Sequence, residues 1–328
     1  MTRHFAPVGS LVMLKSACRI FFLILLTFGN ADNAASGEAA SGRLTGIYEP
    51  SGVEQNGSVI LIIEDEKDQA LHLISGFSQD MIPSTQTLQN CGINLDDLEG
   101  ITADGPYFYL AGSHLAKSDG SRRKKREVFV RLKVHGSSCE QLVFAPSLYK
   151  KLQAALSRLT GRNTTPFQIN IEALAWKQKS DQLYIGLRHP LIKGKSILLI
   201  LENPRELFEK KEVPVFSENP VILELAGGGI RAMSYIDDMG GYLIANETPD
   251  RAGKKQSRLW FWKGGTAPAI PLNTPAIKKL KNIEGISAIQ HSTQSSVILV
   301  CDDGSLKKKK GAHFAIIPVS VLKKSIRR

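Results

Sequence analysis

A charged or polar residue recurs at one position in five short segments of the 328-residue sequence. It stands directly before a glycine or alanine that opens a β run, and the five residues are Ser51, Glu99, Glu172, Arg231 and Glu284. Brought together, like-charged carboxylates would raise one another's pKa values, be neutralised by arginine, or hold a cation. The alternative is structural, with the repeated glutamate accepting backbone N–H groups. Because the five residues differ and arginine replaces glutamate once, a ligand site is also indicated.

A second polar set ends the β run that follows each of these segments: Asp65, Ser113, His114, Arg188, Glu247 and Asp303. Glu99, Glu172 and Glu284 are candidate general bases. Arg188 and Arg231, with Ser113 and His114, are candidate substrate-binding residues. Asp65 and Asp303 are candidate metal ligands, because oxygen donors suit Ca²⁺ or Mg²⁺. The cofactor itself stays open.

Recognised catalytic motifs are missing from the sequence. Ser113 and His114 are adjacent in a β run, so their side chains point to opposite faces and cannot form a nucleophile–base pair. The Gly227–Gly229 run leads into a strand and not into a helix, which excludes a phosphate-binding or dinucleotide loop. Whether the protein is an enzyme is therefore left undecided.

The formal net charge is +11, and two basic runs, Arg122–Arg126 and Lys307–Lys310, contribute much of it. Such runs are most often solvated loops, and the alternative is a patch for anionic surfaces or polymers. No nucleic-acid-binding motif accompanies them. We therefore expect no nucleic-acid partner.

The five segments indicate a repeat architecture. Their glycine or alanine registers are Gly52, Gly100, Ala173, Ala232 and Gly285, at intervals of 48, 73, 59 and 53 residues. A four-stranded propeller blade uses roughly 40–50 residues. Leucines on one face over residues 146–160 predict a short helical insert that lengthens one interval, and Asn203–Glu206 begins a second short helix.

The predicted fold is therefore all-β, a five-bladed β-propeller, with a six-bladed one as the runner-up. The last unit has three strands, and an orphan strand at Arg43–Tyr48 would complete it and close the ring. The propeller domain is expected at residues 43–322, followed by a basic tail at 323–328.

The N-terminus predicts export. Residues 1–31 combine a basic start, the apolar run Ile20–Phe28 and small residues before Ala31, which is typical of a signal peptide. An uncleaved membrane anchor is the alternative. Residues 32–42 are expected to be a disordered linker. The mature protein is expected to be periplasmic or secreted, monomeric and without a transmembrane segment.

Three cysteines lie outside the predicted signal peptide. In an oxidising compartment Cys91 and Cys139 could form a disulfide. Cys301 lies in an apolar run and is expected to be a buried free thiol.

Several of these segments together resemble a known family. Asp96–Ile101, Ala111–His114, Gly186–Pro190 and Gly229–Arg231 are similar to the exported bacterial family called domain of unknown function 3616, over roughly residues 45–320. That family is distantly similar to phytase-like and esterase-like propellers. The resemblance implies a propeller and export, but no settled activity. Ala173 departs from the pattern, which usually has glycine there.

Two functions follow as expectations. One is hydrolysis of an anionic or ester-bearing small molecule at a charged central channel. The other is a propeller of the cell envelope that binds a small anionic ligand, an envelope component or a partner protein without turnover.

Overall fold

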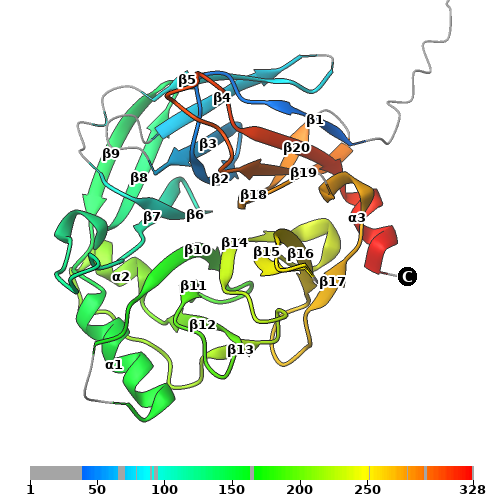
Figure 1. Ribbon diagram of the computed structural model, residues 1–328. Helices are drawn as coiled ribbons and strands as arrows, with labels where there is room; N and C mark the ends of the chain where they lie inside the picture. Colours follow the sequence, from blue (N-terminus) through cyan, green and yellow to red (C-terminus); the bar gives the residue numbers. More distant parts are fainter. Residues whose placement is uncertain are drawn as a thin grey trace, which may run out of the picture. The chain divides into compact units, whose positions relative to one another are not determined.

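The computed structural model describes residues 39–65, 71–78, 80–88, 91, 95–162, 166–250, 252–278, 280–291 and 294–326. In these residues the strands form five four-stranded antiparallel sheets arranged as the blades of a propeller (Figure 1). The predicted all-β, five-bladed fold is confirmed. The six-bladed alternative is wrong.

The blades follow one another along the chain. Blade 1 contains β2 (Pro50–Asn56), β3 (Val59–Glu64), β4 (Leu71–Phe77) and β5 (Pro83–Thr87), and blade 2 contains β6 (Leu98–Asp104), β7 (Tyr107–Gly112), β8 (Phe129–His135) and β9 (Ser138–Phe144). Blade 3 contains β10 (Asn170–Trp176), β11 (Leu183–His189), β12 (Ser196–Leu201) and β13 (Val221–Leu223), and blade 4 contains β14 (Ile230–Ile236), β15 (Gly241–Pro249), β16 (Lys255–Trp262) and β17 (Ile270–Leu272). Blade 5 contains β18 (Ile283–His291), β19 (Gln294–Cys301), β20 (His313–Pro318) and β1 (Ala40–Arg43).

The ring closes through β1, which pairs antiparallel with β20 from Ala40 opposite Ile316 to Arg43 opposite His313. Closure by an N-terminal strand is confirmed, but its predicted position, Arg43–Tyr48, is wrong. Leu44 and Ile47 are buried, and the chain turns inward through Gly46 at a φ of +75°. Residues 44–48 therefore connect the outer strand of blade 5 to the inner strand of blade 1. Part of the expected linker, residues 40–42, belongs to the sheet.

Apolar clusters fill the spaces between blades. The strands alternate side chains between their two faces, so each sheet presents apolar residues to both neighbours. Leu61 and Leu110 lie together between blades 1 and 2, and Val53 lies with Val300 between blades 1 and 5. The innermost strands also contact one another in the order β2, β6, β10, β14, β18 and back to β2. These strands surround the central axis in Figure 1.

The described helices are short. The predicted insert is confirmed as α1 (Tyr149–Thr160), which ends at Gly161 and places Leu152 and Leu156 in the apolar cluster shared by blades 2 and 3. The remaining helical segments are α2 (Pro204–Glu209), α3 (Val319–Ile326) and the 3₁₀ turns η1 (Lys124–Arg126), η2 (Asp237–Met239) and η3 (Pro275–Ile277). Helix α3 crosses the predicted boundary between propeller and tail. None of the helices in the described residues is long and apolar enough to span a membrane.

The cysteines differ from the prediction in one respect. Cys91 and Cys139 are free thiols in this structure, so the predicted disulfide is not formed. Their side chains nevertheless share a hydrogen bond, which together with burial raises the pKa of Cys91. Cys301 is free and buried, as predicted.

Candidate functional site

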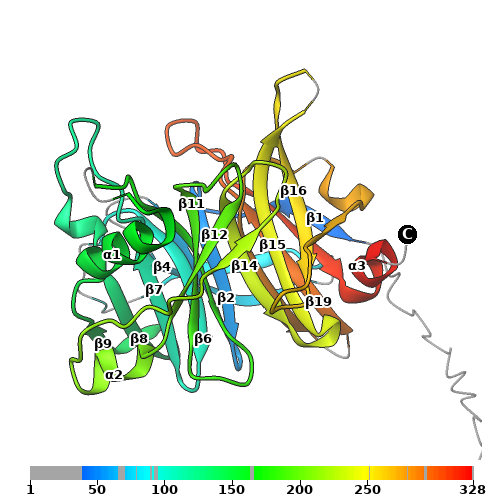
Figure 2. The same cartoon turned by 90° about the horizontal axis from the view of Figure 1, so that it is seen from below.

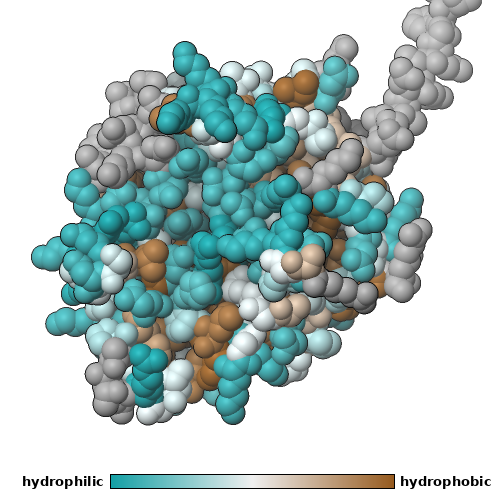
Figure 3. All heavy atoms as spheres, in the orientation of Figure 1, coloured by the Kyte–Doolittle hydropathy of each residue, from teal (hydrophilic) through white to brown (hydrophobic). Residues whose placement is uncertain are grey.

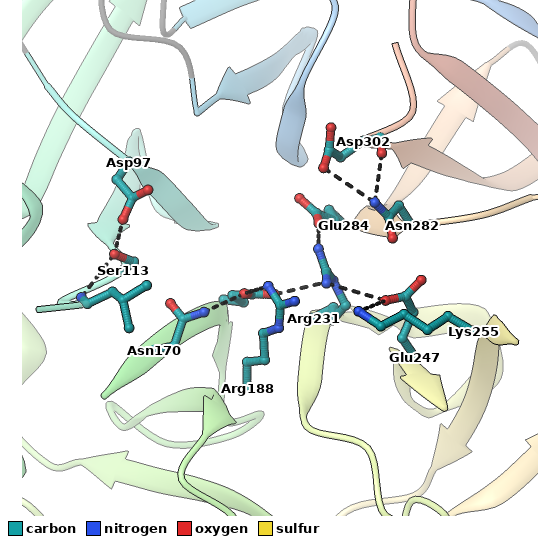
Figure 4. A network of polar contacts seen from close by, with 12 residues as sticks. Asp97, Ser113, Asn170, Arg188, Arg231, Glu247, Lys255, Asn282, Glu284 and Asp302 are labelled. Carbon is teal, nitrogen blue, oxygen red and sulfur yellow. Dashed lines mark hydrogen bonds and ion pairs between the residues drawn. The ribbon is translucent and has the colours of Figure 1, made fainter. Parts of the chain in front are cut away.

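The same backbone irregularity positions one side chain from every blade. The pairing of each innermost strand with its neighbour shifts register near its start, for example between Leu98 and Gly100, and one residue is left unpaired. These bulged residues are the five predicted from the repeat: Ser51, Glu99, Glu172, Arg231 and Glu284. A bulge re-aims the side chain of the extra residue. We call this set the central ring, and Figure 4 shows two of its members, Arg231 and Glu284.

Arg231 is the hub of one half of the ring. Its side chain is only 6% exposed, and its Nε lies 3.3 Å from Oε2 of Glu172. It also pairs with Glu284 and with Glu247, whose Oε2 lies 3.7 Å from Nη1 of Arg231. Figure 4 shows Arg231 between Glu284 and Glu247. A buried guanidinium facing three carboxylates neutralises much of their charge.

Arg188 extends this network toward solvent. Its Nη1 donates to Oε1 of Glu172 at 2.7 Å, and Nδ2 of Asn170 donates to the same oxygen at 2.7 Å. The Arg188 side chain is 33% exposed, so part of it is accessible to solvent. Burial raises the pKa of Glu172, while Arg231 and Arg188 act in the opposite direction.

The half of the ring that contains Glu99 is acidic, because two aspartates lie beside this glutamate. Carboxylate oxygens of Asp65, Asp97 and Glu99 lie within 4.8 Å of one another. Burial, the charge of Asp97 and a hydrogen bond to it raise the pKa of Asp65 to about 7. Burial and the charges of Glu172, Asp65 and Asp97 raise the pKa of Glu99 well above its ordinary value. We call these three residues the carboxylate cluster, which could hold protons or a Ca²⁺ or Mg²⁺ ion.

Glu99 differs from the other two ring glutamates. It makes no hydrogen bond or ion pair with a residue that the structure describes, whereas Glu172 and Glu284 are held by arginine. Nor does any described backbone N–H donate to Glu99, Glu172 or Glu284. The structural alternative, in which the repeated glutamate accepts backbone N–H groups, is therefore wrong for the described residues.

Asp97 was missed by the sequence analysis as a site residue. It has a φ of +63°, accepts a hydrogen bond from the Ser113 hydroxyl, and pairs with Nη1 of Arg126 at 2.9 Å. Asn282 stands at the same place before Glu284 and has a φ of +51°. Aspartate and asparagine are the non-glycine residues that tolerate this conformation best. An Asp or Asn two residues before the bulge was the available signal.

Ser113 and His114 lie behind the mouth, by which we mean the solvent-facing end of the central channel at the ring. Ser113 is fully buried, and its oxygen also accepts a hydrogen bond from the Leu115 N–H at 3.0 Å. His114 is buried, bonds through Nδ1 to the Gly112 carbonyl at 3.0 Å, and has its pKa lowered chiefly by burial. Ser113 thus positions Asp97. Neither side chain reaches the opening in this structure.

Asp65 and Asp303, the predicted metal ligands, belong to different clusters. Oδ1 of Asp303 accepts the backbone N–H of His313 at 2.9 Å, and Oδ2 contacts its ring at 2.5 Å. The neighbouring Asp302 contacts Asn282 and has its pKa raised chiefly by burial, with Arg231 and Arg188 lowering it. Asp302 therefore takes the place at the ring that the sequence had suggested for Asp303.

The channel below the ring is nearly closed. Side chains such as Val53, Ile101 and Met233 leave a cavity of about 10 Å³, roughly the room of one water molecule. The face around the mouth is largely hydrophilic in Figure 3. A ligand would therefore bind on the ring from the open face and would not pass through the channel.

Solved structures of other proteins share only low sequence identity with the chain. The major allergen Mala s 1 of Malassezia sympodialis is 7% identical, with a TM-score of 0.49, over 88% of this chain and 97% of that one. An α-L-arabinofuranosidase of Podospora anserina in complex with cellotriose is 11% identical, with a TM-score of 0.45, over 87% and 92%. No curated protein matches the chain significantly. These likenesses assign no activity.

One protein family matches the sequence. Its profile, described as protein of unknown function (DUF3616), covers residues 159–317, from the end of α1 into β20. This range includes Gly186–Pro190 and Gly229–Arg231 but not Asp96–Ile101 or Ala111–His114, so it is narrower than the predicted similarity. Over residues 159–317 the match confirms the resemblance predicted from the sequence, and this part of the chain carries the pattern of the DUF3616 family.

Proposed function

We propose that the mouth of the propeller binds a small anionic ester and hydrolyses it. The observation that carries this proposal is the juxtaposition of an unpaired acidic group with an arginine that is open to solvent. Glu99 belongs to the carboxylate cluster, in which burial and like charges raise the pKa of Asp65 and of Glu99, and the charge of Glu99 helps to raise the pKa of Arg188. The distant resemblance to phytase-like and esterase-like propellers supports the same class of reaction.

Arg188 would bind the negative charge of the substrate. Guanidinium groups bind carboxylate and phosphate with two parallel N–H donors. Arg188 uses Nη1 for Glu172, and its remaining donors make no hydrogen bond to the residues that the structure describes. Arg231 is buried among three carboxylates and serves to hold the ring together.

The carboxylate cluster would move the protons. A pKa of about 7 at Asp65 means that this group is partly protonated at neutral pH. Glu99 would accept a proton from water while the water oxygen bonds to the acyl carbon or the phosphorus. The ester bond to the leaving oxygen then breaks, and that oxygen takes the proton of Asp65. One group supplies the base and the other the acid.

A divalent cation is the second way in which the cluster could act. Three carboxylates with oxygens within 4.8 Å of one another suit Ca²⁺ or Mg²⁺. Such an ion would keep Asp65, Asp97 and Glu99 ionised and would polarise the ester. Activity that depends on added cation would select this route.

Binding without turnover is the competing proposal. It is favoured by Arg231, because three carboxylates already balance the charge of this buried guanidinium and form a network of ion pairs with it. In that case Arg188 would hold a small anionic ligand or an envelope component on a rigid platform. We also propose that the protein acts as a monomer and that, as its N-terminal sequence indicates, it acts in the periplasm or outside the cell.

The experiment is a hydrolysis screen of the purified protein with phosphoester, carboxylic ester and lactone substrates, with and without Ca²⁺ or Mg²⁺. Glu99→Gln and Arg188→Gln should each lower kcat/KM by about 10²-fold or more. The matched controls are Glu140→Gln and Arg162→Gln, which change exposed residues of blade 2 and of the segment after α1. Equal turnover in the site and control variants would refute the proposed hydrolysis at the mouth. Binding of anions that Arg188→Gln abolishes, without any turnover, would support the platform.

A further inference from the structure

A second cavity lies on blade 4, outside the ring. Its volume is about 470 Å³, and it is lined by the end of the β15–β16 hairpin, by β16 and β17, and by the connection through η3 to blade 5. Figure 2 shows this hairpin rising beyond the neighbouring strands. The 3₁₀ turn η3 packs against β16. Cavities of about 300–1,000 Å³ are the size that small-molecule sites have.

The lining of this cavity, which we call the basic pocket, is strongly cationic. Five basic side chains line it: Lys254, Lys255, Arg258, Lys278 and Lys281. Lys255 lies 3.8 Å from Glu247, and the other four form no ion pair with a described residue. The lining also includes Asp250, whose Oδ1 already accepts the N–H groups of Ala252 and Lys254 at 2.8 Å. Most of the positive charge is therefore uncompensated.

The lining also contains a buried polar group without a hydrogen-bond partner in the part of the chain that the structure describes. Thr274 is only 2% exposed, and its hydroxyl has no hydrogen-bond partner among the described residues. A buried hydroxyl without a partner costs free energy unless something bonds to it. Arg258 donates through Nε to the Thr248 hydroxyl at 2.5 Å, which holds its guanidinium in place.

The floor of the pocket is apolar. Leu259, Leu272, Ile277 and Leu280 line it and are all buried. A simple inorganic anion would use the lysines and would not contact this floor. A ligand with an apolar body and a charged end would contact the part of the floor that is still accessible, at most 7% of each of these residues, and meet the cations at the same time.

We propose that the basic pocket is a binding site for a small organic phosphate with an apolar body. Phosphate carries up to two negative charges at neutral pH, and its oxygens accept from several lysines as well as from a hydroxyl. The lining residues include none of the central ring, and the pocket touches the ring network only through Lys255, which pairs with Glu247 beside Arg231. Its occupation does not depend on the function proposed there.

The test is calorimetric binding to the double variant Glu99→Gln with Arg188→Gln, whose mouth lacks the proposed base and anion-binding residue. The three probes are 1-naphthyl phosphate, inorganic phosphate and 1-naphthol. We expect 1-naphthyl phosphate to bind at least tenfold more tightly than inorganic phosphate, and 1-naphthol to bind weakly. The affinity should fall as salt is raised. Equal affinity for 1-naphthyl phosphate and inorganic phosphate would overturn the role of the apolar floor. Absence of binding by all three probes would overturn the site.

Variants locate the binding. Lys278→Ala with Lys281→Ala removes two exposed charges and should raise the Kd of 1-naphthyl phosphate at least tenfold. The matched control, Lys307→Ala with Lys308→Ala, removes the same charge from exposed residues between β19 and β20 and should leave the Kd unchanged. Thr274→Val keeps the shape and should raise the Kd without lowering Tm. Equal effects of the two lysine pairs would mean that the anion binds to general surface charge, which contradicts the proposal. Because the mouth lacks its proposed base and anion-binding residue in the double variant Glu99→Gln with Arg188→Gln, failure of binding here is distinguishable from failure of the function proposed at the mouth.

Discussion

The two halves of the central ring are built on the same backbone bulge, but they differ in how the charges of the bulged residues are balanced. In blades 3 to 5 the bulged residues are Glu172, Arg231 and Glu284, and the arginine neutralises both acids. In blade 2 the bulged Glu99 meets Asp65 and Asp97, and Arg126 is paired to the aspartate behind it. The bulge thus sets where a side chain points, and its neighbours decide whether its charge is balanced.

Removal of Arg231 should have the largest effect on stability. Arg231→Gln leaves Glu172, Glu247 and Glu284 without their shared cation in a buried place, which we expect to cost about 3–5 kcal/mol of unfolding free energy at neutral pH. Urea denaturation measures it. The loss should shrink at acidic pH, where the glutamates can take up protons. A variant as stable as the wild type would mean that the arginine half is not held by charge.

Oxidation of the two cysteines near the acidic half tests this half without changing the charge of its carboxylates. Cys91 precedes Asp97 by a few residues, and its thiol bonds to that of Cys139, 48 residues along the chain. An oxidant should therefore close a disulfide, with a gain of up to about 4 kcal/mol from the constrained unfolded chain. Mass spectrometry detects the bond and thermal denaturation its effect. Cys139→Ser should abolish both responses.

A divalent cation should stabilise the acidic half selectively. Ca²⁺ or Mg²⁺ at ten times its Kd would add about 1.4 kcal/mol of stability. Asp65→Asn should remove this gain because it removes one carboxylate of the cluster. Asp303→Asn is the control, since Asp303 contacts His313 and lies outside the cluster. If neither ion changes Tm, the cluster binds no divalent cation, and its carboxylates share protons instead.

The smallest effect is the pH dependence due to Asp65. Its pKa is raised to about 7 from an ordinary value of 3.8, so the folded state favours its protonated form. The stability that this preference provides is fully present below about pH 4 and is lost as pH rises toward 7. Asp65→Asn should therefore raise Tm by about 2 °C at pH 8 and by much less at pH 4. The shift at pH 8 corresponds to a gain of roughly 1 kcal/mol in unfolding free energy, after allowing for the solvent exposure of Asp65. An equal shift at both pH values would contradict the assignment.

Much of the fold could be predicted because its cause is local. The glycine or alanine registers mark where the innermost strands need small residues, and a Cβ added at Gly100 would lie 2.8 Å from Leu174 of the next blade. The apolar face of α1 and its end at Gly161 follow from helical periodicity and capping in the same way. The sequence therefore determined the blade count, the helical insert and the five residues of the ring.

The partners of these residues depend on contacts between distant parts of the chain, and only the tertiary structure decided them. Glu99 and Glu284 occupy the same register, yet Glu284 reaches Arg231 of blade 4, whereas Glu99 reaches Asp65 of blade 1. The basic pocket was not predicted either. Its lysines come from two separated segments with no long basic run, and the fold brings their charges together around one apolar floor.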